Sequence, residues 1–215
     1  MSEHEIEPIP GLPDYLPKGE RILWQGAPHW RPLAMRAFRL REVMIYFAAL
    51  MTWRMVSKLW DGAGVLASFD HALTIAPLAL GATAILVVMA YASARTSMYT
   101  ITDRRVVLRI GMALPVNMNI PFDSIEGVDF AAHRDGSGDL AMRIRKGEKL
   151  GYAVLWPHAR PWRYARPEPM LRGLADAQSA ARVLAGALAG HMQPAMSADM
   201  QAASGHQGAP APAHS

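Results

Sequence analysis

The chain has 215 residues, of which 51% are hydrophobic and 19% are charged, and its formal net charge is +4. This length suits one modest domain with additions, and the apolar composition is typical of a small membrane protein that carries a soluble part. Because the sequence contains no cysteine, disulfides, thiolate metal sites and cysteine nucleophiles are excluded.

We expect the first 39 residues to form an N-terminal cytoplasmic segment that contains no membrane-spanning stretch. The segment begins acidic and proline-rich, with no basic region ahead of an apolar stretch, so we expect no secretory signal. Residues 27–41 then contain no acid and four arginines, namely Arg31, Arg36, Arg39 and Arg41.

Two apolar stretches follow, and they predict a transmembrane helical hairpin over residues 40–94. Residues 72–94 contain no charged side chain and would form a helix of about 35 Å, enough to cross a hydrocarbon core of about 30 Å. Residues 40–60 are less apolar because they include Arg54 and Lys58, which could snorkel to the far interface from the outer third of the helix. We expect this helix to span as well, with a surface-lying helix as the alternative.

The distribution of charge predicts the orientation of this hairpin. The connection between the spans carries Asp61 and Asp70 but no lysine or arginine, whereas both flanks are rich in arginine. By the positive-inside rule we expect a multi-pass protein of the inner membrane with both termini in the cytoplasm. Small residues on the second span permit helix association and therefore a homo-oligomer: Ala72, Ala76, Ala90 and Ala94.

Arg54 is a candidate for pairing inside the membrane. The apolar stretches of the two spans offer no acid, so a buried Arg54 would need a carboxylate of another protein or the acidic group of a pigment. His71 lies at a membrane edge and could ligate the magnesium of a chlorin, but an interfacial histidine without a ligand is the favoured interpretation. We therefore predict no cofactor.

Residues 95–192 read as a small antiparallel β-domain. Short runs that are β-branched or alternate between apolar and polar residues recur about every ten residues. They predict strands at residues 98–102, 105–110, 116–120, 124–133, 140–146 and 151–158. An alanine-rich helix over residues 176–192, capped by Asp176, would close the sandwich or barrel. Residues 193–215 lack apolar periodicity, and we expect a disordered tail.

Two segments carry a resemblance to known families. "YTITDRRVVLRIG" with "MNIPFDSIEGV" resembles the pleckstrin-homology-like (PH-like) domain of small bacterial membrane proteins. "GLPDYLPKGERILWQGAPHW" resembles the start of the photosynthetic-complex assembly proteins of phototrophic bacteria, and that similarity extends from about residue 11 to residue 188. The resemblance implies an α+β membrane protein with a two-helix transmembrane hairpin followed by a cytoplasmic PH-like β-sandwich. It also implies reaction-centre and core antenna subunits as partners.

Two groups of residues are candidates for docking. Arg104, Arg105 and Arg109 are expected beside the bilayer, where cations favour an anionic lipid surface or an acidic partner; simple solvated strand faces are the alternative. Trp162, Arg163 and Tyr164 belong to the aromatic and arginine-rich segment 156–169, which favours a protein interface. A rigid cover over the edge of the barrel is the alternative for that segment.

The sequence offers no catalytic constellation. It has no phosphate-binding glycine loop with a lysine, no histidine pair at metal-ligand spacing and no nucleophile elbow. We therefore predict a non-enzymatic assembly factor without metal, cofactor or nucleic acid. A membrane PH-like module that binds lipid headgroups or envelope proteins, unrelated to photosynthesis, is the alternative function.

Overall fold

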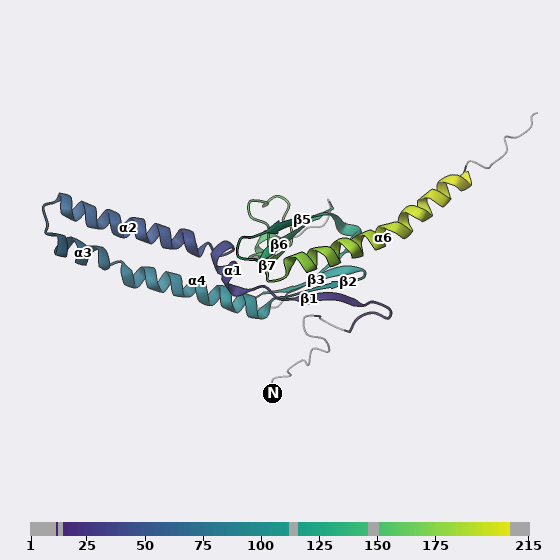
Figure 1. The fold of residues 1–215 in the computed structure, drawn as a ribbon, viewed down its shortest axis with the longest axis horizontal. Coiled ribbons are helices and arrows are strands. Elements are labelled where there is room, and N and C mark those ends of the chain that lie inside the picture. The colour runs from purple at the N-terminus through teal and green to yellow at the C-terminus, as the bar shows by residue number, and fades with distance from the viewer. Residues whose placement is uncertain (1–11, 13–14, 112–115, 146–150, 207–215) are drawn as a thin grey trace, which may run out of the picture.

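The computed structural model describes residue 12 and residues 15–111, 116–145 and 151–206 (Figure 1). Its helices and strands are, in chain order, β1 (Ile22–Gly26), α1 (Trp30–Arg36), α2 (Leu40–Trp60), α3 (Val65–Leu73), α4 (Ala76–Thr96), β2 (Met98–Thr102), β3 (Arg105–Ile110), β4 (Val116–Pro121), the 3-10 turn η1 (Phe122–Ser124), β5 (Ile125–Ala132), β6 (Gly138–Ile144), α5 (Tyr152–Leu155), β7 (Met170–Leu174) and α6 (Ala177–His206). Helices α2, α3 and α4 form a hairpin that projects from one end of a domain built from the strands and α6 (Figure 1).

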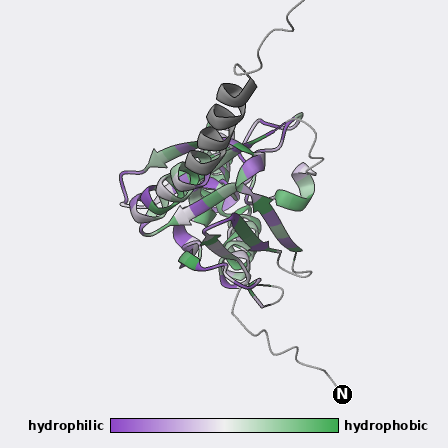
Figure 2. Ribbon diagram, turned by 90° about the vertical axis from the view of Figure 1, so that its right-hand side faces the viewer, coloured by the Kyte–Doolittle hydropathy of each residue, from purple (hydrophilic) through white to green (hydrophobic). Residues whose placement is uncertain are grey.

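The strands form two antiparallel sheets. We call these two sheets and α6 together the sheet domain. One sheet has the order β1-β2-β3-β4 and the other β5-β6-β7. The predicted sandwich is thus confirmed, and so are its first five strands. Viewed from the end opposite to the hairpin, the strands carry both hydrophobic and hydrophilic residues, as expected for sheets with one buried face (Figure 2).

Two strands differ from the prediction. Residues 22–26 were assigned to the N-terminal segment, but they form β1, which pairs with β2, so that Gln25 lies opposite Thr100. The hairpin is therefore an insertion between two neighbouring strands of one sheet, and the sheet domain does not begin at residue 95.

The predicted strand at residues 151–158 is wrong. Its first half is the short helix α5, in which the Trp156 N–H donates to the Tyr152 carbonyl oxygen at 3.0 Å, and the third strand of the second sheet is β7 instead. The alternation of Tyr152, Val154 and Trp156 resembles a strand, but a helical turn lets Leu155 enter the core, with Tyr152 packed against its edge and Val154 and Trp156 at the surface.

The core of the sheet domain lies between the two sheets and α6. Its fully buried side chains come from both sheets and from the helix, and include Ile101, Leu108, Leu140, Leu171 and Leu184. Burial of each such side chain stabilises the fold by about 1.5–3 kcal/mol.

Helix α6 begins as predicted but ends later. The Asp176 carboxylate accepts a hydrogen bond from the Ser179 N–H at 3.1 Å, which confirms the predicted cap. The helix extends to His206, although the prediction ended it at residue 192 and assigned the rest to a disordered tail. The added turns contain alanine, methionine and glutamine, which have high helix propensity. Residues 207–215 of the expected tail lie outside the described residues.

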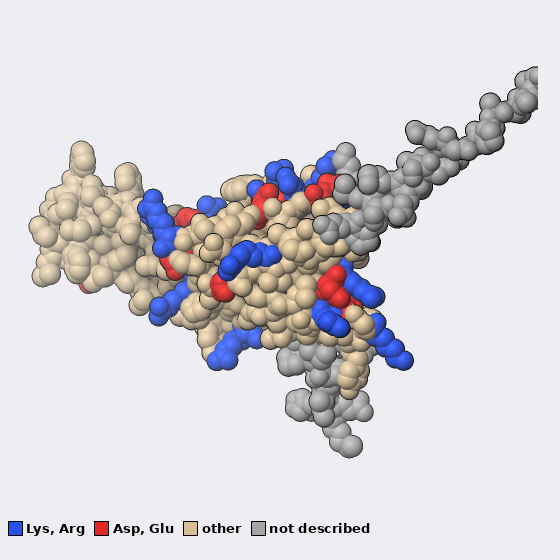
Figure 3. All heavy atoms as spheres, turned by 45° about the vertical axis from the view of Figure 1, so that its right-hand side comes forward, with Lys and Arg blue, Asp and Glu red and all other residues tan. Residues whose placement is uncertain are grey.

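The hairpin exposes its apolar surface. The helical run Val65–Thr96, which comprises α3, the break at residues 74–75 and α4, is long and apolar enough to cross a membrane, and only 6% of its most apolar window is buried within the chain. Within the described residues no other helix meets this criterion; the antiparallel partner α2 contains Arg41, Glu42, Arg54 and Lys58. Figure 3 shows that the outer part of the hairpin is almost free of charged residues on the face in view, whereas charges gather over the sheet domain.

Helix α1 fastens the hairpin to the sheet domain. Leu33, Ala34 and Phe38 pack with Leu40 of α2 and Ala90 of α4 in a second apolar cluster at the base of the hairpin. On the other side, the His29 N–H donates to the carbonyl oxygen of Gly173 in β7 at 2.8 Å. The base of the hairpin and the second sheet are therefore held together through one short helix.

Gly173 is required at this contact, and Gly173→Ala is expected to lower the free energy of unfolding by about 2 kcal/mol. Its φ of +62° is in the left-handed region, and an added Cβ would lie 3.2 Å from the His29 carbonyl oxygen and 3.3 Å from the Pro32 Cβ. Thermal unfolding of the full chain in detergent measures the effect. Gly186→Ala in α6, where a Cβ meets no atom within 4 Å, is the control and should stabilise by about 0.5–1 kcal/mol. Equal unfolding temperatures of the two variants would contradict this role.

Candidate functional site

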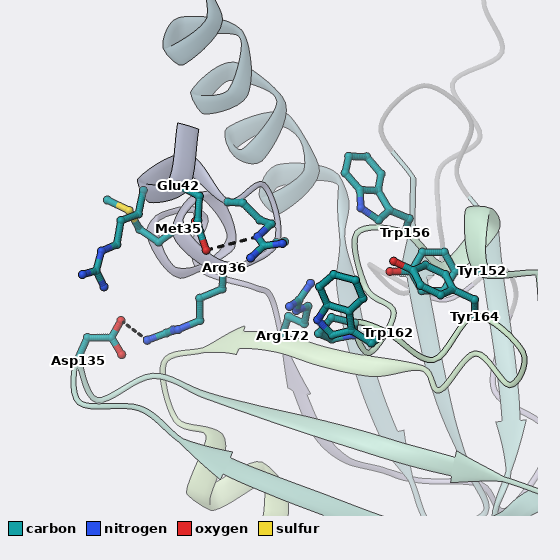
Figure 4. A pocket seen from close by; sticks show the side chains of 13 residues that line it. Met35, Arg36, Glu42, Asp135, Tyr152, Trp156, Trp162, Tyr164 and Arg172 are labelled. Atoms are coloured by element: carbon teal, nitrogen blue, oxygen red, sulfur yellow. Dashed lines mark hydrogen bonds and ion pairs between the residues drawn. The ribbon is translucent and has the colours of Figure 1, made fainter. Parts of the chain in front are cut away.

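A pocket of about 830 Å³ lies where the hairpin meets the sheet domain. We call it the basic–aromatic pocket because arginines and aromatic residues dominate its lining (Figure 4). Helix α1 and the start of α2 supply one side. Helix α5 and the segment of residues 156–169, here called the aromatic loop, supply the other side (Figure 4). The lining residues are Met35, Arg36, Ala37, Arg39, Arg41, Glu42, Asp135, Tyr152, Trp156, Pro161, Trp162, Tyr164 and Arg172.

Two of its four arginines have carboxylate partners. Arg36 donates to the Asp135 carboxylate at 3.1 Å and to the Ser137 hydroxyl at 2.9 Å, which ties α1 to the β5–β6 turn. The Ser137 hydroxyl and then Arg36 lower the pKa of Asp135 to about 2, so this carboxylate is charged at neutral pH. Arg39 lies 3.4 Å from Glu42 at the start of α2.

Arg172 lies at the inner wall of the pocket and differs from the other arginines in its burial. Its side chain belongs to β7, and the residue is only 8% exposed. One guanidinium nitrogen donates to the Pro157 carbonyl oxygen at 2.9 Å, and no carboxylate forms an ion pair with Arg172 in the described part of the chain. Burial lowers the pKa of the guanidinium, and the nearby Asp139 opposes that effect. The pocket therefore has a buried cation with a neutral hydrogen-bond partner.

Aromatic side chains line the mouth of the pocket. The rings of Tyr152 and Tyr164 lie 4.7 Å apart, and Trp162 contacts Tyr164 edge to face. Trp156 contacts Phe38 in the same geometry at 5.1 Å, which links the aromatic loop to the base of the hairpin. Trp162 is 73% exposed and adopts a φ of +66°, so a large apolar ring is held out into the surroundings. Such surfaces are typical of protein or lipid interfaces.

Ion pairs hold the aromatic loop in place. One nitrogen of Arg160 donates to Asp129 of β5 at 2.6 Å and to Glu168 at 2.8 Å. The backbone N–H of Arg160 also donates to the backbone carbonyl oxygen of Glu168. Ala159 and Pro169 form an antiparallel β-bridge, which closes the base of the loop. Because both ends of the loop are fixed to the second sheet, its exposed rings have a defined position.

The structure brings Trp162 and Tyr164 together at this pocket, as members of one candidate docking surface. Arg163 lies outside the lining and is 3.8 Å from Glu168. Sequence reasoning missed Arg172, and no local pattern marks it, because it is one residue of a short buried strand. Arg36, Arg39 and Arg41 were noticed only as determinants of orientation.

Arg104, Arg105 and Arg109 do not form one cluster beside the hairpin. Strand β2 begins directly after α4, and Arg109 lies opposite Met98 at that end of the strand. Arg104 and Arg105 lie beyond the other end of β2, remote from the hairpin (Figure 1). Arg105 forms a two-pronged ion pair with the buried Glu20, at 2.9 and 3.0 Å. The expectation that all three lie beside the bilayer therefore does not fit the fold.

Arg54 finds partners within the hairpin. Its guanidinium donates to the Thr74 hydroxyl at 3.0 Å and to the His71 carbonyl oxygen at 3.3 Å, and it lies 3.4 Å from the His71 ring. These groups lie at the break between α3 and α4, where backbone carbonyls lack helical partners. Neutral oxygens of the same chain thus provide hydrogen bonds to Arg54, in addition to any partner from another molecule.

A buried polar network joins α4 to both sheets and includes the backbone of Arg172. His158 is fully buried, and its ring lies 3.0 Å from the Ser97 hydroxyl and 2.6 Å from the Tyr99 hydroxyl. The Tyr99 hydroxyl also accepts a hydrogen bond from the Arg172 backbone N–H at 3.3 Å, which ties β7 into the same network. Within the described residues, no group of histidines and acids could hold a metal ion.

Comparisons with known proteins cover most of this architecture. Residues 62–188 match the family model described as a bacterial PH domain. The chain is also 41% identical over 194 residues to an uncharacterized 23.7 kDa protein of Rhodobacter capsulatus in the 5′ region of puhA, covering 86% of this chain and 87% of that relative. No solved structure matches. The residues matched by the family model begin in the turn of the hairpin, so they include the aromatic loop and Arg172 but not α1 or β1.

Proposed function

This chain belongs to the bacterial PH domain family, and we propose that it is a non-enzymatic membrane-bound assembly factor for the photosynthetic reaction centre and its core antenna. The hairpin would anchor the chain in the inner membrane, and the sheet domain would offer a cytoplasmic docking surface to partly assembled subunits.

The observation that carries the photosynthetic part is the position of the relative from Rhodobacter capsulatus, which lies in the 5′ region of the reaction-centre gene puhA. Identity of 41% over most of both chains supports a shared role. The gene neighbourhood favours this proposal over a lipid or envelope module without a link to photosynthesis.

The exposed hairpin supports the membrane part of the proposal. The run Val65–Thr96 leaves nearly all of its apolar window uncovered, which is costly in water and favourable in lipid. In our proposal α2 crosses beside it, with Arg54 supported near the outer end by His71 and Thr74. The arginines at the base and the acids near the turn favour both termini in the cytoplasm.

The basic–aromatic pocket and the aromatic loop would form the docking surface. Exposed Trp162 and Tyr164 provide apolar area on a fixed loop, and tryptophan and tyrosine are enriched at the centres of protein interfaces. An assembly factor of this kind acts by mass action, because it binds intermediates more tightly than the finished complex and thereby raises their population.

The test is the near-infrared absorption spectrum of membranes from a strain that lacks this chain, grown under pigment-inducing conditions. We expect selective loss of the reaction-centre and core antenna bands, with recovery on supplying the intact chain. A chain with Trp162→Ala and Tyr164→Ala should restore the bands incompletely, whereas Arg166→Ala, an exposed change in the same loop that lies outside the pocket, should restore them. An unchanged spectrum in the deletion strain would overturn the proposal.

A further inference from the structure

The outer part of the hairpin holds two opposite charges, Arg54 of α2 and Asp70 of α3, that form no ion pair within the described part of the chain. Arg54 donates to His71 and Thr74 through Nε and one terminal nitrogen, Nη2. Its other terminal nitrogen, Nη1, has no hydrogen-bond partner among the described residues. Unpaired charges are costly in lipid, so both groups favour partners from another molecule.

The two charges lie at the same depth of the hairpin, where α2 and α3 lie side by side (Figure 1). Arg54 precedes the end of α2 at Trp60 by six residues, and His71 follows the start of α3 at Val65 by six residues. At about 1.5 Å per residue, both lie about 9 Å from the turn. Asp70 directly precedes His71, so its depth differs from that of Arg54 by only about 1.5 Å.

Asp70 does not pair with Arg54 of its own chain, because it projects from another side of α3. Successive side chains are rotated by about 100° around a helix, so Asp70 lies beside the face on which His71 meets α2. Asp70 is exposed. It borders a shallow hollow of about 510 Å³ together with Leu66, Ala67 and Phe69. Its carboxylate is therefore accessible to another molecule beside the hairpin.

We propose that two copies of this chain dimerise in the membrane through two reciprocal ion pairs, in which Arg54 of each copy donates from Nη1 to Asp70 of the other copy. This inference rests on the proposed function, because it takes the hairpin to lie in the membrane. Copies inserted in the same direction keep each residue at its own depth, so only residues of equal depth meet around a two-fold axis along the membrane normal.

Arg54 and Asp70 satisfy this condition, and the acids of α2 and the turn do not. Glu42 lies in the first turn of α2, at the base of the hairpin. Asp61 lies at the turn, where Lys58 is 3.9 Å away. Asp70 is thus the acid of the hairpin that has both the depth of Arg54 and no partner of its own.

The surroundings of the two charges favour a second copy over a lipid phosphate. An exposed aromatic ring precedes each charge in the sequence: Trp53, 70% exposed, precedes Arg54, and Phe69, 50% exposed, precedes Asp70. Packed between two hairpins, these rings would exclude water and thereby strengthen the ion pairs. A phosphate would attract Arg54 but repel Asp70, whereas a second copy provides the counter-charge of both.

Joint recovery of two tagged copies tests the proposal. Full chains with different affinity tags are expressed together in a bacterium without photosynthetic proteins, so that no client links them, and are purified from detergent through one tag. We expect intact copies to be recovered together. Two Arg54→Asp copies, or two Asp70→Arg copies, should be recovered together about tenfold less, because both contacts become repulsive. One Arg54→Asp copy with one Asp70→Arg copy should be recovered like the intact chain, because both contacts are attractive again.

Lys58→Asp is the matched control, because it makes the same change of charge nearer the turn of the same helix and should leave joint recovery unchanged. If the charge-reversed copies do not insert, Asp70→Asn decides the outcome, and two such copies should be recovered together severalfold less than intact copies.

Four results would overturn the proposal. They are separate purification of intact copies, undiminished recovery of either charge-reversed pair, failure of the mixed pair to recover, or an equal loss in Lys58→Asp. A chain that stays in carbonate-washed membranes as single copies overturns only this inference. A chain that does not stay in those membranes overturns the proposed function as well.

Discussion

His158→Ala is expected to lower the free energy of unfolding of the sheet domain by about 3 kcal/mol, and the unfolding temperature by roughly 10 °C. The ring is fully buried between α4 and the two sheets, so its removal leaves a cavity. The Tyr99 hydroxyl loses its hydrogen-bond partner at 2.6 Å, and the Ser97 hydroxyl loses its partner at 3.0 Å. Unsatisfied polar groups in a core are costly, so the cavity and the lost hydrogen bonds act in the same direction.

The same histidine makes stability depend on pH. Burial, and to a smaller degree Arg172, lowers the pKa of His158 from 6.5 to about 3. In the unfolded chain the imidazole takes up a proton below about pH 6.5, but in the folded chain it stays neutral. The unfolded state then binds more protons, so stability is full above pH 6.5 and falls as the pH decreases towards 3, by up to about 1.4 kcal/mol per pH unit.

Thermal unfolding of the full chain in detergent measures both effects. The measurements are made at about pH 7.5, 6.5 and 5.5, which lie above, at and below the ordinary histidine pKa of about 6.5. The variant should be less stable at every pH and should lose less stability between pH 6.5 and 5.5 than the intact chain. His191→Ala is the control: this half-exposed histidine pairs with an exposed Asp123 and should change stability by less than about 1 kcal/mol. Equal effects of the two substitutions would contradict the role of the buried network.

Ile85→Asp is expected to reduce the membrane-bound fraction of the chain about tenfold or more. The residue lies near the middle of α4 and is 62% exposed. A charged aspartate at the centre of a spanning helix disfavours insertion by about 3 kcal/mol. The amount of chain that stays with carbonate-washed membranes is the measurement.

The matched control places the same charge near the turn of the hairpin. Val65 is also exposed, but it begins α3, close to the surface that we assign to the outer interface. An aspartate there contacts water and favours a helix N-terminus, so Val65→Asp should leave insertion nearly unchanged. If both variants stay in the membrane, or both leave it equally, the hairpin does not cross the bilayer as proposed.

Several features of the fold follow from local patterns in the sequence. The run without charges at residues 72–94 predicted α4, and alternation of apolar and polar residues predicted β4 and β6. Asp176 marked the start of α6 because a capping carboxylate acts on residues only a few positions away. Each of these signals depends on neighbours within one or two turns, so it survives without knowledge of the tertiary structure.

The candidate site follows only from the tertiary structure. Trp162 drew attention by its composition, but its partners in the pocket, Arg36 and Arg172, lie far away in the sequence, and no local pattern relates the three. Arg104 and Arg109 seemed to be neighbours of the bilayer because they follow the hairpin closely in the chain. Most of the length of β3 separates them, so that only Arg109 returns to the end of the sheet near the hairpin.

The apolar run, the alternating strands and the closing helix are thus determined by short-range sequence, because side-chain period and backbone propensity act within each segment. Packing decides three other features. They are the pairing of β1 with β2 across the whole hairpin, the docking of α1 on Gly173 and the burial of Arg172 beside the aromatic loop. These contacts join residues that are distant along the chain. They are stable only when both sheets, the helix base and the loop are present together, because burial and hydrogen-bond satisfaction depend on all of the surrounding segments.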